Sequence, residues 1–150
     1  MDENIKIKME HEISRIEKLI IDVEPLLKLC KIKEPDIIEI SAAAQVLHSF
    51  YNGIESILIL FFKYLNEELP NDSKWHKTLF EMAFGNNSQN IIIFSDEIKK
   101  DLEKYLLYRH FIRHSYSSEL DWEQMKLMVN GLNEIWNKVR SYFEQFIRGV

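Results

Sequence analysis

Apolar residues recur every three or four positions over most of the chain, which is the spacing of one face of an α-helix. This pattern predicts a first helix over roughly residues 3 to 31, with Pro25 as a kink. A second, more apolar stripe predicts a helix over about residues 36 to 68. Gly53 in its middle indicates either the close passage of another helix or a plain kink.

The second half of the chain predicts three more helices. A short one over about residues 73 to 84 would take Asp72 or Ser73 as its N-cap. A longer one over about 96 to 113 follows, and the last runs over about 121 to 148 with apolar residues in a nearly unbroken three-four alternation. The expected fold class is therefore all-α, an antiparallel bundle of four long helices plus one short helix in a single domain over residues 1–150.

One apolar run does not fit the helical spacing. Ile91–Phe94 has the length of a strand, but the sequence offers no partner strand, so we expect coil or a helical turn there. The chain has only four glycines and three prolines, which leaves little room for turns and favours long helices.

Charge and cysteine content narrow the class of protein. The formal net charge of −5 argues against a broad basic face that coats nucleic acid, so no DNA partner is expected. The single cysteine, Cys30, lies on an apolar stripe as core filler and suits a reducing cytosol. No apolar run reaches membrane-spanning length and the first residues lack a signal-peptide pattern. We expect a soluble, cytoplasmic protein without a membrane partner.

The segment from Tyr108 to Tyr116 is the part of the chain richest in groups that can do chemistry. Arg109 continues the apolar stripe of Leu102 and Tyr105, so its guanidinium should face the core. Because arginine cannot lose its charge at ordinary pH, burial there requires an anion, a carboxylate partner or an interface.

Serines after His114 favour a helix end near Arg113 or His114. Beyond that end the chain can fold His114 and Tyr116 back towards the guanidinium. Arg109, His110, Arg113 and His114 then form a compact positive cluster on an acidic background, which suits a few phosphates.

The positive cluster has a structural and a chemical interpretation. Cations favour the negative end of a helix dipole, which explains Arg113 but not an arginine on the buried stripe. A phosphodiester site explains both: Arg109 would stabilise negative charge in the transition state, and His114 would move protons near neutral pH.

The other histidines carry weaker signals. The i, i+4 spacing of His110 and His114 is compatible with zinc, but the adjacent arginines would repel a cation, so we expect no metal and no cofactor. His11, His48 and His76 are interpreted as solvated or locally hydrogen-bonded.

The segment from Tyr108 to Tyr116 resembles a known family. Arg109, His114 and Tyr116 match the R-x4-H-x-Y signature of the HepT-like branch of the HEPN superfamily, in which His110 is a tolerated polar residue. The likeness extends over most of the chain, through the segments Tyr51–Glu55, Leu69–His76 and Arg113–Leu120.

The resemblance implies a metal-independent endoribonuclease that acts as the toxin of a type VII-like toxin–antitoxin pair. In such enzymes the arginine and histidine of two protomers meet across a homodimer interface, and the ribose 2′-hydroxyl attacks the adjacent phosphate of the RNA substrate. Arg109 and His114 would be catalytic here, with His110 in support and Arg113 binding RNA phosphate. Tyr116 would accept AMP from a nucleotidyltransferase antitoxin of the MntA type.

Three alternatives remain open at the level of sequence. The chain could be a catalytically inactive HEPN module that binds nucleotide or RNA, a helical bundle that only binds a partner, or the antitoxin of its pair. A cleavage assay with and without EDTA separates the first from a nuclease, and a neighbouring nucleotidyltransferase gene argues against the second.

Overall fold

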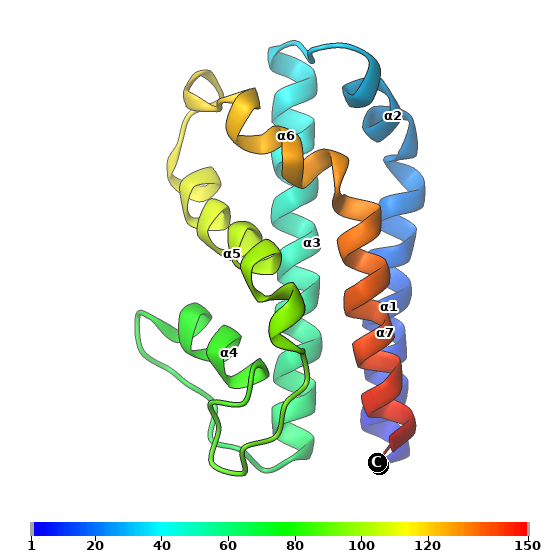
Figure 1. The fold of residues 1–150 in the computed structure, drawn as a ribbon, viewed down its shortest axis with the longest axis vertical. Coiled ribbons are helices and arrows are strands. Elements are labelled where there is room, and N and C mark those ends of the chain that lie inside the picture. The colour runs from blue at the N-terminus through cyan, green and yellow to red at the C-terminus, as the bar shows by residue number, and fades with distance from the viewer. Residues whose placement is uncertain (1, 150) are drawn as a thin grey trace.

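The computed structural model describes residues 2–149 and confirms the all-α fold class (Figure 1). The described chain forms α1 (Glu3–Asp22), α2 (Glu24–Ile32), α3 (Ile37–Tyr64), α4 (Trp75–Ala83), α5 (Lys99–His114), α6 (Trp122–Asn130) and α7 (Leu132–Gly149), with 3-10 turns at Asp96–Ile98 and Ser117–Glu119. Within residues 2–149, no helix combines the length and the apolar character needed to cross a membrane.

Helix α3 is the element on which the others pack. It runs the length of the molecule, with α1 and α7 on one side and α4 and α5 on the other (Figure 1). Its start is fixed by a capping box, in which Asp36 accepts a hydrogen bond from the Glu39 amide at 2.8 Å and Glu39 accepts one from the Asp36 amide at 2.9 Å. Its buried side chains are apolar or aromatic except for Glu55, so a charge lies inside the core.

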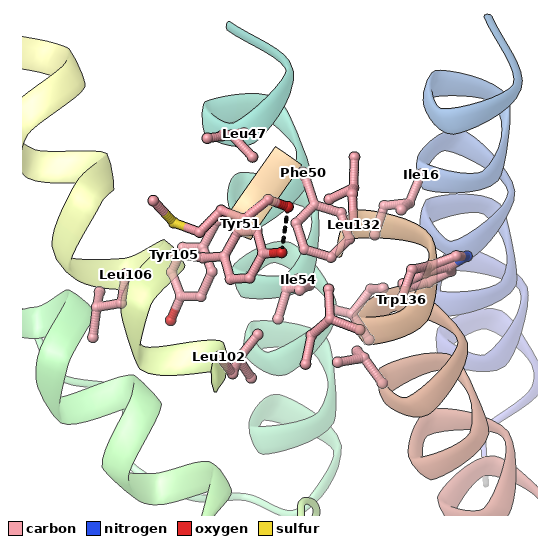
Figure 2. Packing of buried hydrophobic residues seen from close by; sticks show 14 of the residues in the cluster. Ile16, Leu47, Phe50, Tyr51, Ile54, Leu102, Tyr105, Leu106, Leu132 and Trp136 are labelled. Carbon is pink, nitrogen blue, oxygen red and sulfur yellow. Dashed lines mark hydrogen bonds between the residues drawn. The ribbon is translucent and has the colours of Figure 1, made fainter. Parts of the chain in front are cut away.

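Aromatic side chains join α3 to the helices on either side (Figure 2). Phe50 lies fully buried between Tyr105 of α5 and Trp136 of α7, at ring-centroid distances of 5.4 and 6.2 Å. Such aromatic contacts add specific geometry to the hydrophobic burial. They hold α5 against α3 and thereby set the position of the residues further along α5.

Gly53 marks a close approach of two helices, one of the two explanations that the sequence allowed. A Cβ atom at this position would lie 2.7 Å from Cγ1 of Ile16 on α1. No side chain fits there without moving Ile16, so the glycine lets α1 lie tightly along α3.

The expected single N-terminal helix is two helices in the structure. α1 ends at Asp22 and α2 begins at Glu24, with Val23 between them. Pro25 is the physical reason, because it has no amide hydrogen to continue the α1 ladder but is well suited to the first turn of a new helix.

The expected C-terminal helix is likewise divided, at Gly131 between α6 and α7. The Gly131 amide donates to the Leu127 carbonyl at 2.9 Å, and a Cβ here would lie 2.9 Å from the same oxygen. α6 begins at Trp122, close to the expected start near residue 121, and Asp121 caps it by accepting a hydrogen bond from the Glu123 amide.

Two other predicted boundaries were wrong by a few residues. α3 ends at Tyr64 rather than near residue 68, because Asn66 adopts a left-handed backbone conformation with φ of 59°. α4 begins at Trp75 without a side-chain cap; the Asp72 carboxylate instead accepts from the Lys74 amide, one residue before the helix.

The Ile91–Phe94 run is non-helical, in agreement with the expected coil. Ile92 forms one isolated antiparallel bridge with Phe84, and Ile93 and Phe94 are buried in the core. Hydrophobic burial therefore explains Ile93 and Phe94 without a sheet, whereas Ile92 is 63% exposed.

Candidate active site

A groove of about 1020 Å³ lies along α4 and α5. These two helices occupy the same side of α3 (Figure 1). The groove is lined by more cations than acids, although the whole chain is acidic. Its basic lining residues, histidines aside, are Lys74, Lys77, Arg109 and Arg113, and its acidic ones are Asp72 and Glu103. A local excess of positive charge attracts phosphate even on a protein of negative net charge.

Arg109 is held between α3 and α4 by three polar side chains. Its side chain is only 12% exposed. Nε donates to Oδ1 of Asn52 at 2.9 Å and lies 3.7 Å from Oε1 of Glu55, while Nη1 donates to Nε2 of His76 at 3.3 Å. The sequence required an anion, a carboxylate or an interface to compensate this buried charge, and Glu55 supplies the carboxylate within the chain.

Glu55 connects Arg109 to His76. It is 3% exposed, and Oε2 accepts a hydrogen bond from Nδ1 of His76 at 2.7 Å. Burial raises the pKa of the Glu55 carboxyl, against the lowering effects of the His76 hydrogen bond and the Arg109 charge. One buried carboxylate thus orients both a guanidinium and an imidazole.

The hydrogen bonds around Arg109 extend through Asn52 to His48. Asn52 accepts from Arg109 through its oxygen and contacts Nε2 of His48 through Nδ2 at 3.1 Å. Because an amide nitrogen only donates, Nε2 of His48 accepts and Nδ1 carries the hydrogen. Burial, and then the charges of Arg109 and Arg113, lower the pKa of His48 and favour this neutral form.

The structure brings four of the sequence-predicted site residues to the groove. Arg109, His110, Arg113 and His114 all line it, and α5 ends at His114 as expected. The rings of His110 and His114 lie 4.5 Å apart, and both side chains are exposed.

The expected folding back of the chain onto the guanidinium is not observed. Tyr116 is 81% exposed and is not part of the groove lining. Ser115 and Tyr116 have extended backbone, which carries the chain away from the end of α5. The partners of Arg109 come from α3 and α4 instead.

Sequence reasoning missed the polar residues opposite Arg109. His48, Asn52 and Glu55 follow four- and three-residue steps on α3, so the shared helical face of three polar residues that can pair was the available signal. The interpretation of His76 as solvated or locally bonded was wrong, because its partner Glu55 is 21 residues away in sequence. Only the tertiary packing of α4 on α3 reveals that pair.

Within the described part of the chain, no group of three or more His, Cys, Asp or Glu side chains is arranged to hold a metal ion. The groove offers hydrogen-bond donors and positive charge, which are suited to an anionic ligand.

A protein-family model described as HepT-like protein matches residues 42–150. The match begins in the first turns of α3 and so includes every residue of the polar network around Arg109. No curated protein and no solved structure matches the chain.

The contributions of Arg109 and Glu55 to stability should be strongly coupled. We expect Arg109→Met to lower the free energy of unfolding by about 3–5 kcal/mol, because Glu55 then stays buried without its cation. Glu55→Met should cost a similar amount, and the double variant clearly less than the sum of the two. Chemical denaturation followed by circular dichroism measures all three values.

Lys28→Ala is the matched control, since it breaks an exposed ion pair with Glu24 and should change stability by less than about 1 kcal/mol. Additive losses for Arg109→Met and Glu55→Met would contradict a direct interaction between the two side chains.

Proposed function

The chain belongs to the HepT-like family of the HEPN superfamily, and on that premise we propose that it is the ribonuclease toxin of a cytoplasmic toxin–antitoxin pair. The observation that carries the proposal is the placement of Arg109. Its side chain is only 12% exposed and is held through Nε and Nη1, yet it lines a groove that also contains His114. An arginine fixed in this way is preorganised for a phosphate.

The proposed reaction is a metal-independent cleavage of RNA. The ribose 2′-oxygen attacks the adjacent phosphorus, the bond to the 5′-oxygen breaks, and a 2′,3′-cyclic phosphate remains. Negative charge grows on the phosphate oxygens during this step, and Arg109 would stabilise that charge. His114 is exposed in the groove and supplies the proton that the leaving 5′-oxygen needs.

Supporting roles follow from the same groove. Arg113 is exposed and binds phosphates that flank the reacting one, and His110 lies beside His114 as an additional polar group.

The functional unit is a homodimer, as in the family, so that the grooves of two protomers act together on one RNA. Glu55 already compensates the charge of Arg109 within one protomer, so burial of this residue is not an argument for the dimer.

Exposure of Tyr116 supports its role as the acceptor of AMP. The ring is 81% exposed just beyond the end of α5, two residues after His114. A nucleotidyltransferase antitoxin of the MntA type would transfer adenylate to its hydroxyl. The added phosphodiester charge and adenine would lie near the end of the groove and compete with RNA there.

Arg109→Lys and His114→Ala test the nuclease directly. Arg109→Lys keeps a cation near Glu55 but loses the planar guanidinium, whose paired N–H donors match a phosphate. We expect this variant to reduce RNA cleavage at least tenfold. His114→Ala should reduce cleavage by about 10²–10⁴-fold, because the leaving oxygen loses its proton donor. Both are measured with purified protein and labelled RNA, by the rate of cleavage and by detection of the cyclic phosphate.

His11→Ala removes an exposed histidine of α1 that lies outside the groove, and Lys104→Ala removes an exposed cation of α5 that also lies outside it. Both controls should cleave like the unmodified chain, and EDTA should have no effect. Binding of RNA without cleavage by the unmodified chain would favour the catalytically inactive HEPN module instead.

Tyr116→Phe tests the proposed inactivation. The variant has no hydroxyl to receive AMP, so it should remain toxic when its nucleotidyltransferase partner is co-expressed, whereas the unmodified chain should gain adenylate and lose toxicity. Intact-mass measurement and growth curves give the two readouts. Adenylate on Tyr108 or Ser115 in the unmodified chain would show that Tyr116 is not the acceptor.

A further inference from the structure

His76 differs from the other histidines of the groove in having a buried carboxylate partner. It lies in the first turn of α4, its side chain is 20% exposed, and Nδ1 contacts Glu55 at 2.7 Å. His110 and His114 are exposed, and neither makes a hydrogen bond to a carboxylate among residues 2–149. The Trp75 ring covers His76 at a centroid distance of 3.5 Å and further restricts its motion.

The partners of His76 determine which of its nitrogens carries the hydrogen. A guanidinium has donors and no acceptor, so Nε2 must accept the hydrogen bond from Nη1 of Arg109. The hydrogen of the neutral ring is then on Nδ1, where it is donated to Glu55. The neutral His76 ring is therefore held in the tautomer whose lone pair lies on Nε2, where it accepts from Arg109.

This arrangement matches the requirements of a general base. A histidine base needs an unprotonated nitrogen near the reacting hydroxyl and a second group that orients the ring. Nε2 of His76 and Nη1 of Arg109 are 3.3 Å apart, a long hydrogen bond that substrate atoms could readily replace. A phosphate oxygen that accepts from Nη1 would bind beside Nε2, because the two nitrogens are neighbours.

From this geometry we infer that His76 is the catalytic base of the proposed ribonuclease reaction, an inference that rests on the proposed function. Nε2 accepts the proton of the 2′-hydroxyl as the 2′-oxygen forms its bond to phosphorus. The bond from phosphorus to the 5′-oxygen breaks, and the leaving oxygen takes a proton from His114. Glu55 acts as a positioning residue, which holds the His76 ring and stabilises the imidazolium that forms.

His76→Asn separates a catalytic from a structural role. The asparagine amide can still donate to Glu55 from near the place of Nδ1, but no basic nitrogen replaces Nε2. We expect cleavage to fall by about 10²–10⁴-fold while the circular dichroism spectrum and the cooperative thermal transition persist. His76→Ala should be equally slow and should recover activity when free imidazole is added, which requires a folded groove.

An RNA substrate with sulfur in place of the bridging 5′-oxygen distinguishes the base from the acid, because a thiolate leaves without a proton. On this substrate His114→Ala should regain most of its lost rate, and His76→Asn should remain slow. Recovery of His76→Asn on the sulfur substrate, or near-normal cleavage of ordinary RNA by this variant, would overturn the assignment of the base.

The test also separates this inference from the function on which it rests. Cleavage by the unmodified chain with an unaffected His76→Asn variant would leave the ribonuclease in place and remove His76 from its mechanism. Absence of cleavage by the unmodified chain and by the His11→Ala control would overturn the ribonuclease proposal, and this inference with it.

Discussion

One largely buried ion pair, Arg109 with Glu55, lies at the junction of three helices and constrains how they pack. A charge taken out of water is costly unless it meets an opposite charge and fills its hydrogen bonds. Here Glu55 supplies the charge, and Asn52 and His76 supply hydrogen-bond partners at 2.9 and 3.3 Å. The pair ties α5 to both α3 and α4, so the same contacts that satisfy the charges also shape the groove.

The scaffold gives these polar groups a fixed place. Phe50, Tyr105 and Trp136 form a rigid aromatic contact across α3, α5 and α7 (Figure 2), one turn of α5 before Arg109. Preorganised groups in a partly buried site stabilise charge more strongly than solvated ones, because they need little rearrangement during the reaction. Arg113 and His114 are exposed and line the same groove as Arg109, which the core holds in place.

Much of the helical pattern was predictable from the sequence, and the departures have local causes. Periodicity predicted the four long helical stretches, and Pro25 predicted a kink where the chain divides into α1 and α2. Periodicity does not register the break at Gly131, where the apolar spacing continues from α6 into α7. The burial of Arg109 was predictable in the same way, from its place on an apolar stripe. Its partners were not, because Asn52, Glu55 and His76 come from other helices that only the tertiary packing brings close.

We propose that the guanidinium of Arg109, and not merely the exposed cations, binds the RNA backbone. Nitrogen-15 NMR of the chain titrated with a non-cleavable 2′-fluoro RNA measures this directly. We expect saturable shifts of the Arg109 side-chain resonances and of Nε2 of His76. Arg140 pairs with Glu17 outside the groove, and its resonances should not change. Shifts confined to Arg113 and other exposed cations, with Arg109 unmoved at saturation, would contradict it.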